Sequence, residues 1–124
     1  FVFMNFTGSD WCIYCMLINK KFFKHEAFIK LAADHFVCLI VDFPRFKEQD
    51  EKLKKFNQEL AQKHLVRGFP AIIITDRRGK AVGRSGYKRG MDGAQYVEHL
   101  SELLGHANLT KSKAQLPENI DDDD

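Results

Sequence analysis

Two cysteines separated by two residues carry the clearest chemistry in this chain. Cys12 and Cys15 lie in the run Ser9-Asp10-Trp11-Cys12-Ile13-Tyr14-Cys15-Met16. An apolar segment, residues 1–6, leads into this run and helical residues follow it, so we expect Cys12 at or just before a helix N-terminus. Unpaired N–H groups and the helix dipole favour a thiolate there. Because this spacing lets the two sulfurs close into a small ring, we expect thiol–disulfide exchange.

The two thiols are expected to act in sequence. The Cys12 thiolate attacks a substrate disulfide and forms a mixed disulfide, which Cys15 then resolves. The products are a reduced substrate and a Cys12–Cys15 disulfide, and the reverse cycle oxidises the substrate. We expect this redox-active pair to work without a separate cofactor.

A zinc site or a metallochaperone is the alternative for such a pair. Structural zinc takes four cysteine or histidine ligands, and beyond the pair only Cys38 remains among the three cysteines. Cys38 lies in a predicted strand, where we expect it to be buried as a small hydrophobe. A metallochaperone motif more typically reads Met-x-Cys-x-x-Cys. The five histidines are scattered without ligand spacing, so we expect no metal.

Composition indicates one globular domain. The chain has 124 residues, 44% of them hydrophobic, and no apolar run long enough to cross a bilayer. Its net charge of +2 hides an asymmetry, because residues 117–124 hold five acids and no base. The remaining twelve acids face nineteen bases, six of which lie between Asp76 and Asp92 without an acid among them. This stretch is either a solvated hairpin and loop or a surface that attracts acidic substrates or anionic membranes. No nucleic-acid-binding motif is present.

Hydrophobic patterning predicts an α/β domain with a mixed sheet flanked by helices. After the strand at residues 1–6, a helix should run to about Lys24, followed by a strand buried on both faces at residues 36–43. A charged helix follows from about residue 48 to 64, with Leu53, Phe56, Leu60 and Ala61 on its apolar face. Residues 71–75 and 80–84 form a hairpin, and Asp92 caps a last helix that ends at Gly105. Met16 and the phenylalanines are expected in the core. We divide the chain into a domain at residues 1–105 and a flexible, polar and acidic tail at residues 106–124.

This order of elements, with W-C-x-x-C at the first strand-to-helix turn and Val66-Arg-Gly-Phe-Pro70 before the third strand, resembles the thioredoxin family over residues 1–105. The resemblance implies a thioredoxin-like fold in which Pro70 forms a cis peptide bond beside the sulfurs. It also implies that the exposed backbone of Phe69 pairs with a substrate peptide as an added strand. Trp11, Ile13, Tyr14 and Gly86 are the further residues expected at the substrate surface.

Within that family, the run from Phe6 to Cys15 is most similar to bacterial envelope proteins of the chlamydial DsbH type and, more distantly, to the C-terminal domain of DsbD. This similarity implies a monomeric reductase of cysteine-containing proteins in the periplasm or otherwise outside the cytoplasm, supplied with electrons by a DsbD-like membrane protein. The Ile13-Tyr14 dipeptide carries neither the charge nor the imidazole typical of strong oxidants, which also favours a reductase. An oxidase or isomerase, or a non-redox module that binds peptides beside Pro70, remains the alternative.

Three features depart from an ordinary thioredoxin. Ile13-Tyr14 replaces Gly-Pro, and Phe6 replaces a buried aspartate six residues before the first cysteine, leaving Asp10 as the nearest acid in sequence. The lysine that usually faces this aspartate falls at Cys38. The chain also starts at the strand leading into the motif, whereas thioredoxin has a further strand and helix before it. Since the chain begins with Phe1 and shows no signal-peptide pattern, we expect a processed or trimmed polypeptide.

Overall fold

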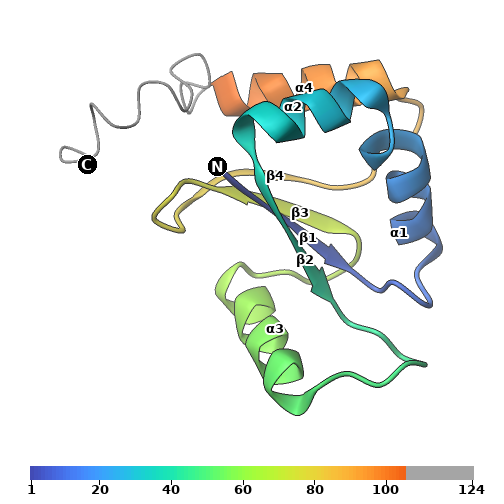
Figure 1. The fold of residues 1–124 in the computed structure, drawn as a ribbon, viewed down its shortest axis with the longest axis vertical. Helices are drawn as coiled ribbons and strands as arrows, with labels where there is room; N and C mark the ends of the chain where they lie inside the picture. Colours follow the sequence, from blue (N-terminus) through green and yellow to red (C-terminus); the bar gives the residue numbers. More distant parts are fainter. Residues whose placement is uncertain (106–124) are drawn as a thin grey trace.

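A mixed sheet of four strands forms the centre of the fold (Figure 1). The computed structural model describes residues 1–105, in which the strands are β1 Val2–Thr7, β2 Val37–Asp42, β3 Ala71–Thr75 and β4 Ala81–Ser85. They lie in the order β2-β1-β3-β4. β1 runs parallel to β2 and antiparallel to β3, and β4 returns antiparallel to β3. The predicted mixed sheet and the predicted hairpin are therefore confirmed.

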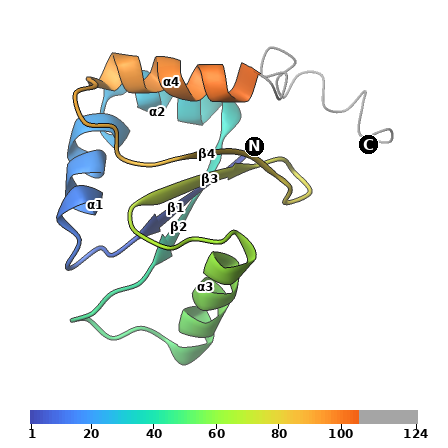
Figure 2. The same ribbon diagram turned by 180° about the vertical axis from the view of Figure 1, so that it is seen from behind.

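Helices cover both faces of this sheet (Figures 1 and 2). α1 Ile13–Ile18, α2 Glu26–His35 and α4 Gly93–Gly105 lie on one side, and α3 Glu51–Lys63 lies on the other. Two apolar cores follow from this arrangement. The larger contains Phe3, Ile18, Phe22, Phe28, Phe36, Ile72, Ile74, Tyr96, Leu100 and Leu104. The smaller, on the α3 side, contains Met4, Phe6, Val41 and Ile73.

The segment after the cysteines is more broken than the single helix that we predicted to about Lys24. α1 passes into a π-helical segment, η1 Asn19–Phe23, in which the Lys24 N–H donates to the Asn19 carbonyl at 3.1 Å. His25 is extended, and its Nδ1 accepts from the Ala27 N–H at 3.1 Å, so His25 caps the separate helix α2. The apolar spacing did not reveal this break because a capping histidine is not a typical N-cap residue.

The prediction that residues 36–43 are buried on both faces is wrong. β2 is the outer strand of the sheet in the described part of the chain, and Val37 and Ile40 are each 68% exposed. Cys38, expected to be buried, is exposed as well. Of these residues, Phe36 and Val41 are buried in the core, at 7% and 1% exposure. A continuous apolar run is typical of a central strand, but the position of a strand in the sheet depends on which other segments pair with it.

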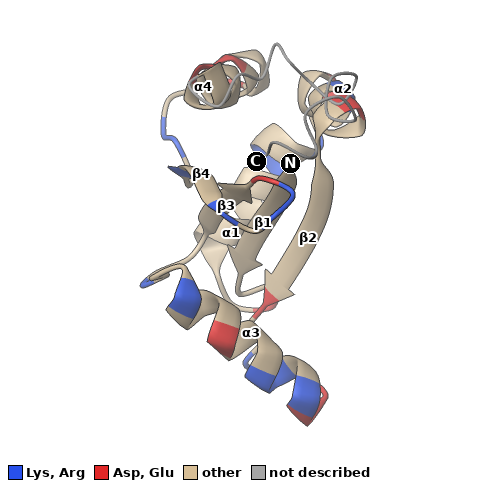
Figure 3. Cartoon of the chain, turned by 90° about the vertical axis from the view of Figure 1, so that its left-hand side faces the viewer, with Lys and Arg blue, Asp and Glu red and all other residues tan. Residues whose placement is uncertain are grey.

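α3 begins later than predicted and buries less of its apolar face. Asp50 caps it, accepting from the Lys52 and Leu53 N–H groups at 3.0 and 3.2 Å. Leu60 and Ala61 pack on the smaller core as expected, but Leu53 and Phe56 are about half exposed. Figure 3 shows that positively and negatively charged residues recur along this helix. Two further residues expected in the core are exposed: Met16 and Phe46.

α4 begins and ends as predicted. Asp92 Oδ1 accepts from the Gln95 N–H at 2.8 Å while Gln95 Oε1 accepts from the Asp92 N–H at 2.9 Å, which is a reciprocal capping box. Tyr96, Leu100 and Leu104 are fully buried. The Tyr96 hydroxyl also donates to the Gly86 carbonyl at 3.2 Å, which connects α4 to the β4–α4 loop. The flexible tail that we predicted at residues 106–124 lies outside the described residues.

Candidate active site

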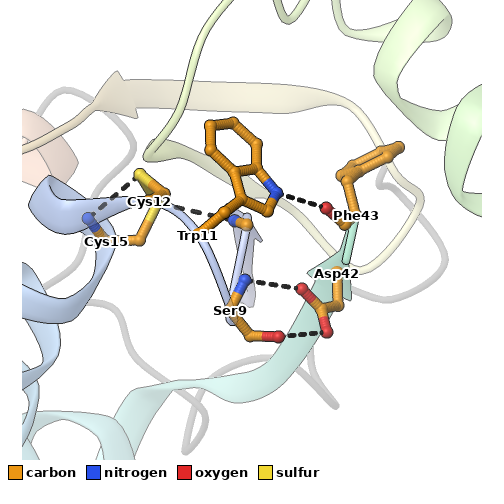
Figure 4. The surroundings of a disulfide bond; sticks show 7 residues. Ser9, Trp11, Cys12, Cys15, Asp42 and Phe43 are labelled. Atoms are coloured by element: carbon orange, nitrogen blue, oxygen red, sulfur yellow. Dashed lines mark hydrogen bonds between the residues drawn. A yellow bond between two sulfur atoms is a disulfide. The ribbon is translucent and has the colours of Figure 1, made fainter. Parts of the chain in front are cut away.

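Cys12 and Cys15 form a disulfide bond where β1 is followed by α1 (Figure 4). β1 ends at Thr7, and the Gly8 carbonyl accepts from the N–H groups of Trp11 and Cys12 at 3.2 and 2.9 Å, which closes the turn before the helix. Cys12 is the N-cap of α1, and its Sγ accepts from the Cys15 N–H at 3.2 Å. Cys15 Sγ accepts from the Gly8 N–H at 3.5 Å. Both polar contacts of the sulfurs are thus with backbone donors, which stabilise negative charge on sulfur.

Burial differs between the two cysteines in the direction that their predicted roles require. Cys12 is 6% exposed and Cys15 is 1% exposed, while the two residues between them, Ile13 and Tyr14, are 69% and 45% exposed. An attacking sulfur must be reached by another protein, and a resolving sulfur has to reach only its neighbour. The structure places the pair as predicted, and the assignment of roles stays a prediction.

The turn before the cysteines is bound to the loop between β2 and α3. Ser9 donates from its backbone N–H and its hydroxyl to the Asp42 carboxylate at 2.9 and 2.6 Å. The Trp11 indole N–H donates to the Phe43 carbonyl at 2.7 Å. Figure 4 shows both connections side by side, reaching from the cysteine turn to the end of β2. These bonds fix the indole ring next to the disulfide.

Asp10 strengthens the same connection. Its carboxylate accepts from the backbone N–H groups of Arg45, Phe46 and Lys47 at 2.9, 3.0 and 2.9 Å. These donors, with that of Arg45 first, hold the pKa of Asp10 below its ordinary value, so the carboxylate is ionised at neutral pH. Asp10 is therefore an anchor for the loop, a role that its position in the sequence did not suggest.

An aromatic cluster lies on the Trp11 side of the disulfide. The rings of Trp11 and Phe69 meet edge-on with centroids 5.8 Å apart, and Phe43 stacks on Phe69 at 5.0 Å. The guanidinium of Arg45 lies over the indole, 3.7 Å from its centroid. The peptide bond between Phe69 and Pro70 is cis. Residues from two loops, the one before α3 and the one after it, thus surround the indole.

A second aromatic cluster lies on the Tyr14 side. Tyr14 packs on Tyr87 with centroids 5.5 Å apart, and the contacts continue from Tyr87 to Phe22 at 5.7 Å and from Phe22 to Tyr96 at 4.1 Å. This series of rings connects the residue between the cysteines to the larger core. The Arg89 guanidinium donates to the Tyr14 hydroxyl at 3.1 Å, which joins the β4–α4 loop to the cysteine motif.

Gly86 and Pro70 lie against each other between these clusters. A Cβ at Gly86 would lie 3.3 Å from the Pro70 carbonyl oxygen, so the backbones approach closely. The structure therefore brings Trp11 to Phe69 and Pro70 to Gly86, as the resemblance implied. Sequence reasoning missed the roles of Phe43, Arg45 and Arg89. Arg89 lies in the acid-free basic stretch noted in the sequence, whereas nothing in the local sequence marked the other two.

Phe6 occupies the position at which the sequence comparison placed an aspartate in thioredoxin. It is fully buried in the smaller core, with the ring of His64 edge-on at 6.4 Å. Within residues 1–105, the structure brings together no group of three or more histidine, cysteine, aspartate or glutamate side chains that could hold a metal ion.

A family model described as a thioredoxin-like domain matches residues 1–101. The chain belongs to the thioredoxin-like family. A solved structure described as DsbH oxidoreductase has the same fold as this thioredoxin-like domain, with a TM-score of 0.79. The two sequences are 35% identical, and the match covers 84% of this chain and 72% of the other. A thioredoxin from Thermus thermophilus, 19% identical with a TM-score of 0.61 over 90% of this chain and 78% of the other, supports the fold alone. The expected fold and family resemblance are confirmed.

Curated relatives of this thioredoxin-like domain include three Dsb proteins. The disulfide bond reductase DsbH of Chlamydia pneumoniae is 36% identical over 80% of this chain and 59% of its own length. The thioredoxin-related protein DsbJ of the same organism is 29% identical over 82% of this chain and 28% of its own. The thiol:disulfide interchange protein DsbD of Vibrio vulnificus is 30% identical over 77% of this chain and 15% of its own length. The chain therefore spans about three fifths of the DsbH relative and less of the others. None of the helices in residues 1–105 has the length and apolar character needed to cross a membrane.

Proposed function

We propose that this thioredoxin-like domain is a thiol–disulfide oxidoreductase that reduces disulfide bonds in other proteins outside the cytoplasm. One observation carries the proposal: the Cys12–Cys15 disulfide lies at the first turn of α1, and backbone N–H groups donate to both sulfurs. A structural disulfide needs no donors placed on its sulfurs, whereas a pair that passes through a thiolate is stabilised by them.

The reaction starts from the reduced pair. The Cys12 thiolate attacks one sulfur of the substrate disulfide, the substrate S–S bond breaks, and the released substrate thiolate takes a proton from solvent. Cys15 then loses its proton and attacks Cys12 Sγ in the mixed disulfide, which releases the second substrate thiol. Two electrons have passed to the substrate, and the domain is left with the Cys12–Cys15 disulfide that the structure contains.

The N–H of Cys15 stabilises both the reactant and the product of this cycle. It donates to Cys12 Sγ in the oxidised structure, and the same N-cap position offers a donor to the Cys12 thiolate. No ionisable side chain replaces the family's buried aspartate at position 6, where Phe6 is packed. We therefore assign the proton from Cys15 to solvent that enters when the mixed disulfide opens the site.

The substrate surface is formed by residues from three loops. We assign to it Trp11, Ile13 and Tyr14 from the motif, Phe69 and Pro70 before β3, and Gly86 after β4. Gly86 has no side chain where its backbone approaches the Pro70 carbonyl, which suits an extended peptide that pairs with the backbone of Phe69.

Reduction, rather than oxidation, is supported by the dipeptide and by the named relatives. Ile13 and Tyr14 add neither a charge nor an imidazole beside the Cys12 sulfur, so the thiolate is not over-stabilised as in strong oxidants. DsbH carries the name disulfide bond reductase. By the same analogy, the domain acts in the periplasm or an equivalent space, and its electrons come from a membrane protein of the DsbD kind. It needs no cofactor beyond its own dithiol.

An insulin reduction assay tests this proposal, with dithiothreitol as the electron source. We expect turnover by the unmodified domain and by Cys38→Ser, and none by Cys12→Ser. Equilibration with glutathione redox buffers gives the direction, and we expect a potential nearer about −270 mV than about −120 mV. A potential above about −180 mV would indicate an oxidase or isomerase. Peptide binding without any turnover would indicate a non-redox binding module.

A further inference from the structure

We propose that Arg89 determines substrate specificity at this site, by receiving the carboxylate of an aspartate or glutamate that neighbours the substrate cysteine. The inference rests on the proposed oxidoreductase function and adds a class of substrate to it: disulfides in acidic sequence surroundings.

Geometry places Arg89 against Tyr14, one of the two residues between the cysteines. Its Nη2 donates to the hydroxyl of Tyr14, the residue immediately before Cys15, at 3.1 Å. Tyr14 is held in turn by Tyr87, with ring centroids 5.5 Å apart, and Tyr87 lies on the buried ring of Phe22. The guanidinium is thus oriented by a hydroxyl that belongs to the cysteine motif itself, although the two residues are 75 positions apart in sequence.

The charge of Arg89 is not balanced by this contact. Its hydrogen-bond partner is a neutral hydroxyl, and the side chain is exposed, so N–H groups of the guanidinium remain available to a further acceptor. The sequence from Arg77 to Met91 contains no acid, and Lys88 lies next to Arg89. Asp92, the first acid after this stretch, is engaged by the Gln95 N–H in the cap of α4.

The other arginine of the site differs in this respect. The guanidinium of Arg45 lies over the Trp11 ring, and the nearby Lys47 ammonium forms an ion pair with Asp42 at 3.3 Å. On the Trp11 side, therefore, the Arg45 guanidinium is engaged by an aromatic ring and the Lys47 ammonium by a carboxylate of the domain. On the Tyr14 side, the Arg89 guanidinium contacts a neutral hydroxyl, so a substrate carboxylate gains more binding free energy from Arg89 than from Arg45.

An arginine suits this role because its planar fork binds a carboxylate through two N–H groups. The Tyr14 hydroxyl occupies one edge of the guanidinium and pre-orients the remaining donors, which lowers the entropy lost when a carboxylate binds. Since the site is exposed, the gain for one charge pair is modest and depends on salt, and we expect about three- to fivefold in kcat/KM at low ionic strength.

Paired peptide substrates test the proposal. One is a disulfide-linked dimer of a short peptide whose cysteine lies between two glutamates, and the other has glutamines in their place. The ratio of their kcat/KM values is measured for the unmodified domain, Arg89→Gln, Arg89→Lys and Arg45→Gln. Arg77→Gln, on the turn between β3 and β4, is the control for general surface charge. Each ratio is divided by the ratio for reduction by dithiothreitol alone, because glutamates change the intrinsic reactivity of a disulfide.

We expect the unmodified domain to prefer the glutamate peptide, Arg89→Gln to lose the preference, and Arg89→Lys, Arg45→Gln and Arg77→Gln to keep at least half of it. About 0.3 M salt should reduce the preference to near one. Turnover of both peptides without a preference, or an equal loss in Arg45→Gln and Arg89→Gln, would overturn this inference and leave the oxidoreductase function intact. Failure to reduce either peptide would instead contradict the proposed function.

Discussion

The indole N–H of Trp11 donates a 2.7 Å hydrogen bond to the backbone carbonyl of Phe43, across a separation of 32 residues. This bond ties the residue preceding the first cysteine to the end of β2. The indole is confined on its other sides by the guanidinium of Arg45 and the ring of Phe69. The orientation of the side chain next to the disulfide is therefore set by loops that are distant in sequence, and variants in those loops should change the site.

Gly8→Ala should displace Trp11. A Cβ at position 8 would overlap the indole ring, whereas a Cβ at Gly68 would have no neighbour within 4 Å, which makes Gly68→Ala the matched control. We expect Gly8→Ala to lower the free energy of unfolding by about 1–3 kcal/mol and to shift the fluorescence of the single tryptophan. Gly68→Ala should stay within about 0.5 kcal/mol of the unmodified domain. Equal stability and equal fluorescence in both variants would contradict the packing described for Trp11.

Asp10→Ala should release the loop between β2 and α3. The backbone N–H groups of Arg45, Phe46 and Lys47 all donate to this carboxylate, so their hydrogen exchange should become faster in the variant. Asp50→Ala is the control, because Asp50 also accepts two backbone N–H groups but at the start of α3. If Asp10→Ala leaves the amide hydrogen exchange of residues 45–47 unchanged, Asp10 does not hold this loop in place.

The same contact predicts a pH dependence. Hydrogen bonds from the backbone hold the pKa of Asp10 below its ordinary value of about 4, so the folded state binds this proton less readily than the unfolded chain. The stabilisation is complete above that ordinary value and is lost as the pH falls through the lowered pKa. Protection of the amides of residues 45–47 should follow this titration, and Asp10→Ala should remove the pH dependence.

Alkylation of the reduced domain should distinguish its thiols. We expect iodoacetamide at pH 7 to label Cys12 first, because the Cys15 N–H stabilises a thiolate there. Cys38 is exposed, but partial burial raises the pKa of its thiol, so little thiolate forms at this pH. Its labelling should become about tenfold faster per pH unit until the raised pKa is reached. Peptide mass mapping checks the order, and faster labelling of Cys38 than of Cys12 at pH 7 would contradict it.

Trapping should identify the partners of the reaction. In Cys15→Ser the mixed disulfide on Cys12 cannot be resolved, so adducts that dithiothreitol reverses should accumulate, whereas a variant with serine at both positions should capture none. Both variants also carry Cys38→Ser, because the exposed third thiol would otherwise form adducts of its own. We expect secreted substrates and a membrane donor of electrons. Equal capture by the single and double variants would favour a non-redox binding module.

Local sequence patterns correctly predicted the features of the fold that depend on neighbouring residues. The Asp92 cap of α4, the Asp76–Gly79 turn and the inward face of α4 all follow from residues close to one another in the chain. The Cys12–Cys15 disulfide follows from a two-residue spacing in the same way. These features depend on the order of residue types, which the sequence gives directly.

Contacts between loops could not be predicted in the same way. Asp10 reaches Arg45, and Tyr14 reaches Arg89, only because the sheet brings three loops to one end of the domain. The wrong prediction that β2 is buried on both faces has a related cause. An apolar run at the edge of a sheet has the same pattern as one in the centre, and only the pairing of strands distinguishes them, so the exposure of Cys38 was not visible in the sequence.

The outer position of β2 has a consequence for the domain in solution. Within residues 1–105, β2 is hydrogen-bonded to a neighbour on one side only, and Val37 and Ile40 lie along it with large exposed fractions. An open strand edge with apolar side chains is a template for sheet formation between molecules. Concentrated samples of this domain should therefore self-associate through β2, and a lysine at position 40 should raise the concentration at which light scattering first detects aggregates.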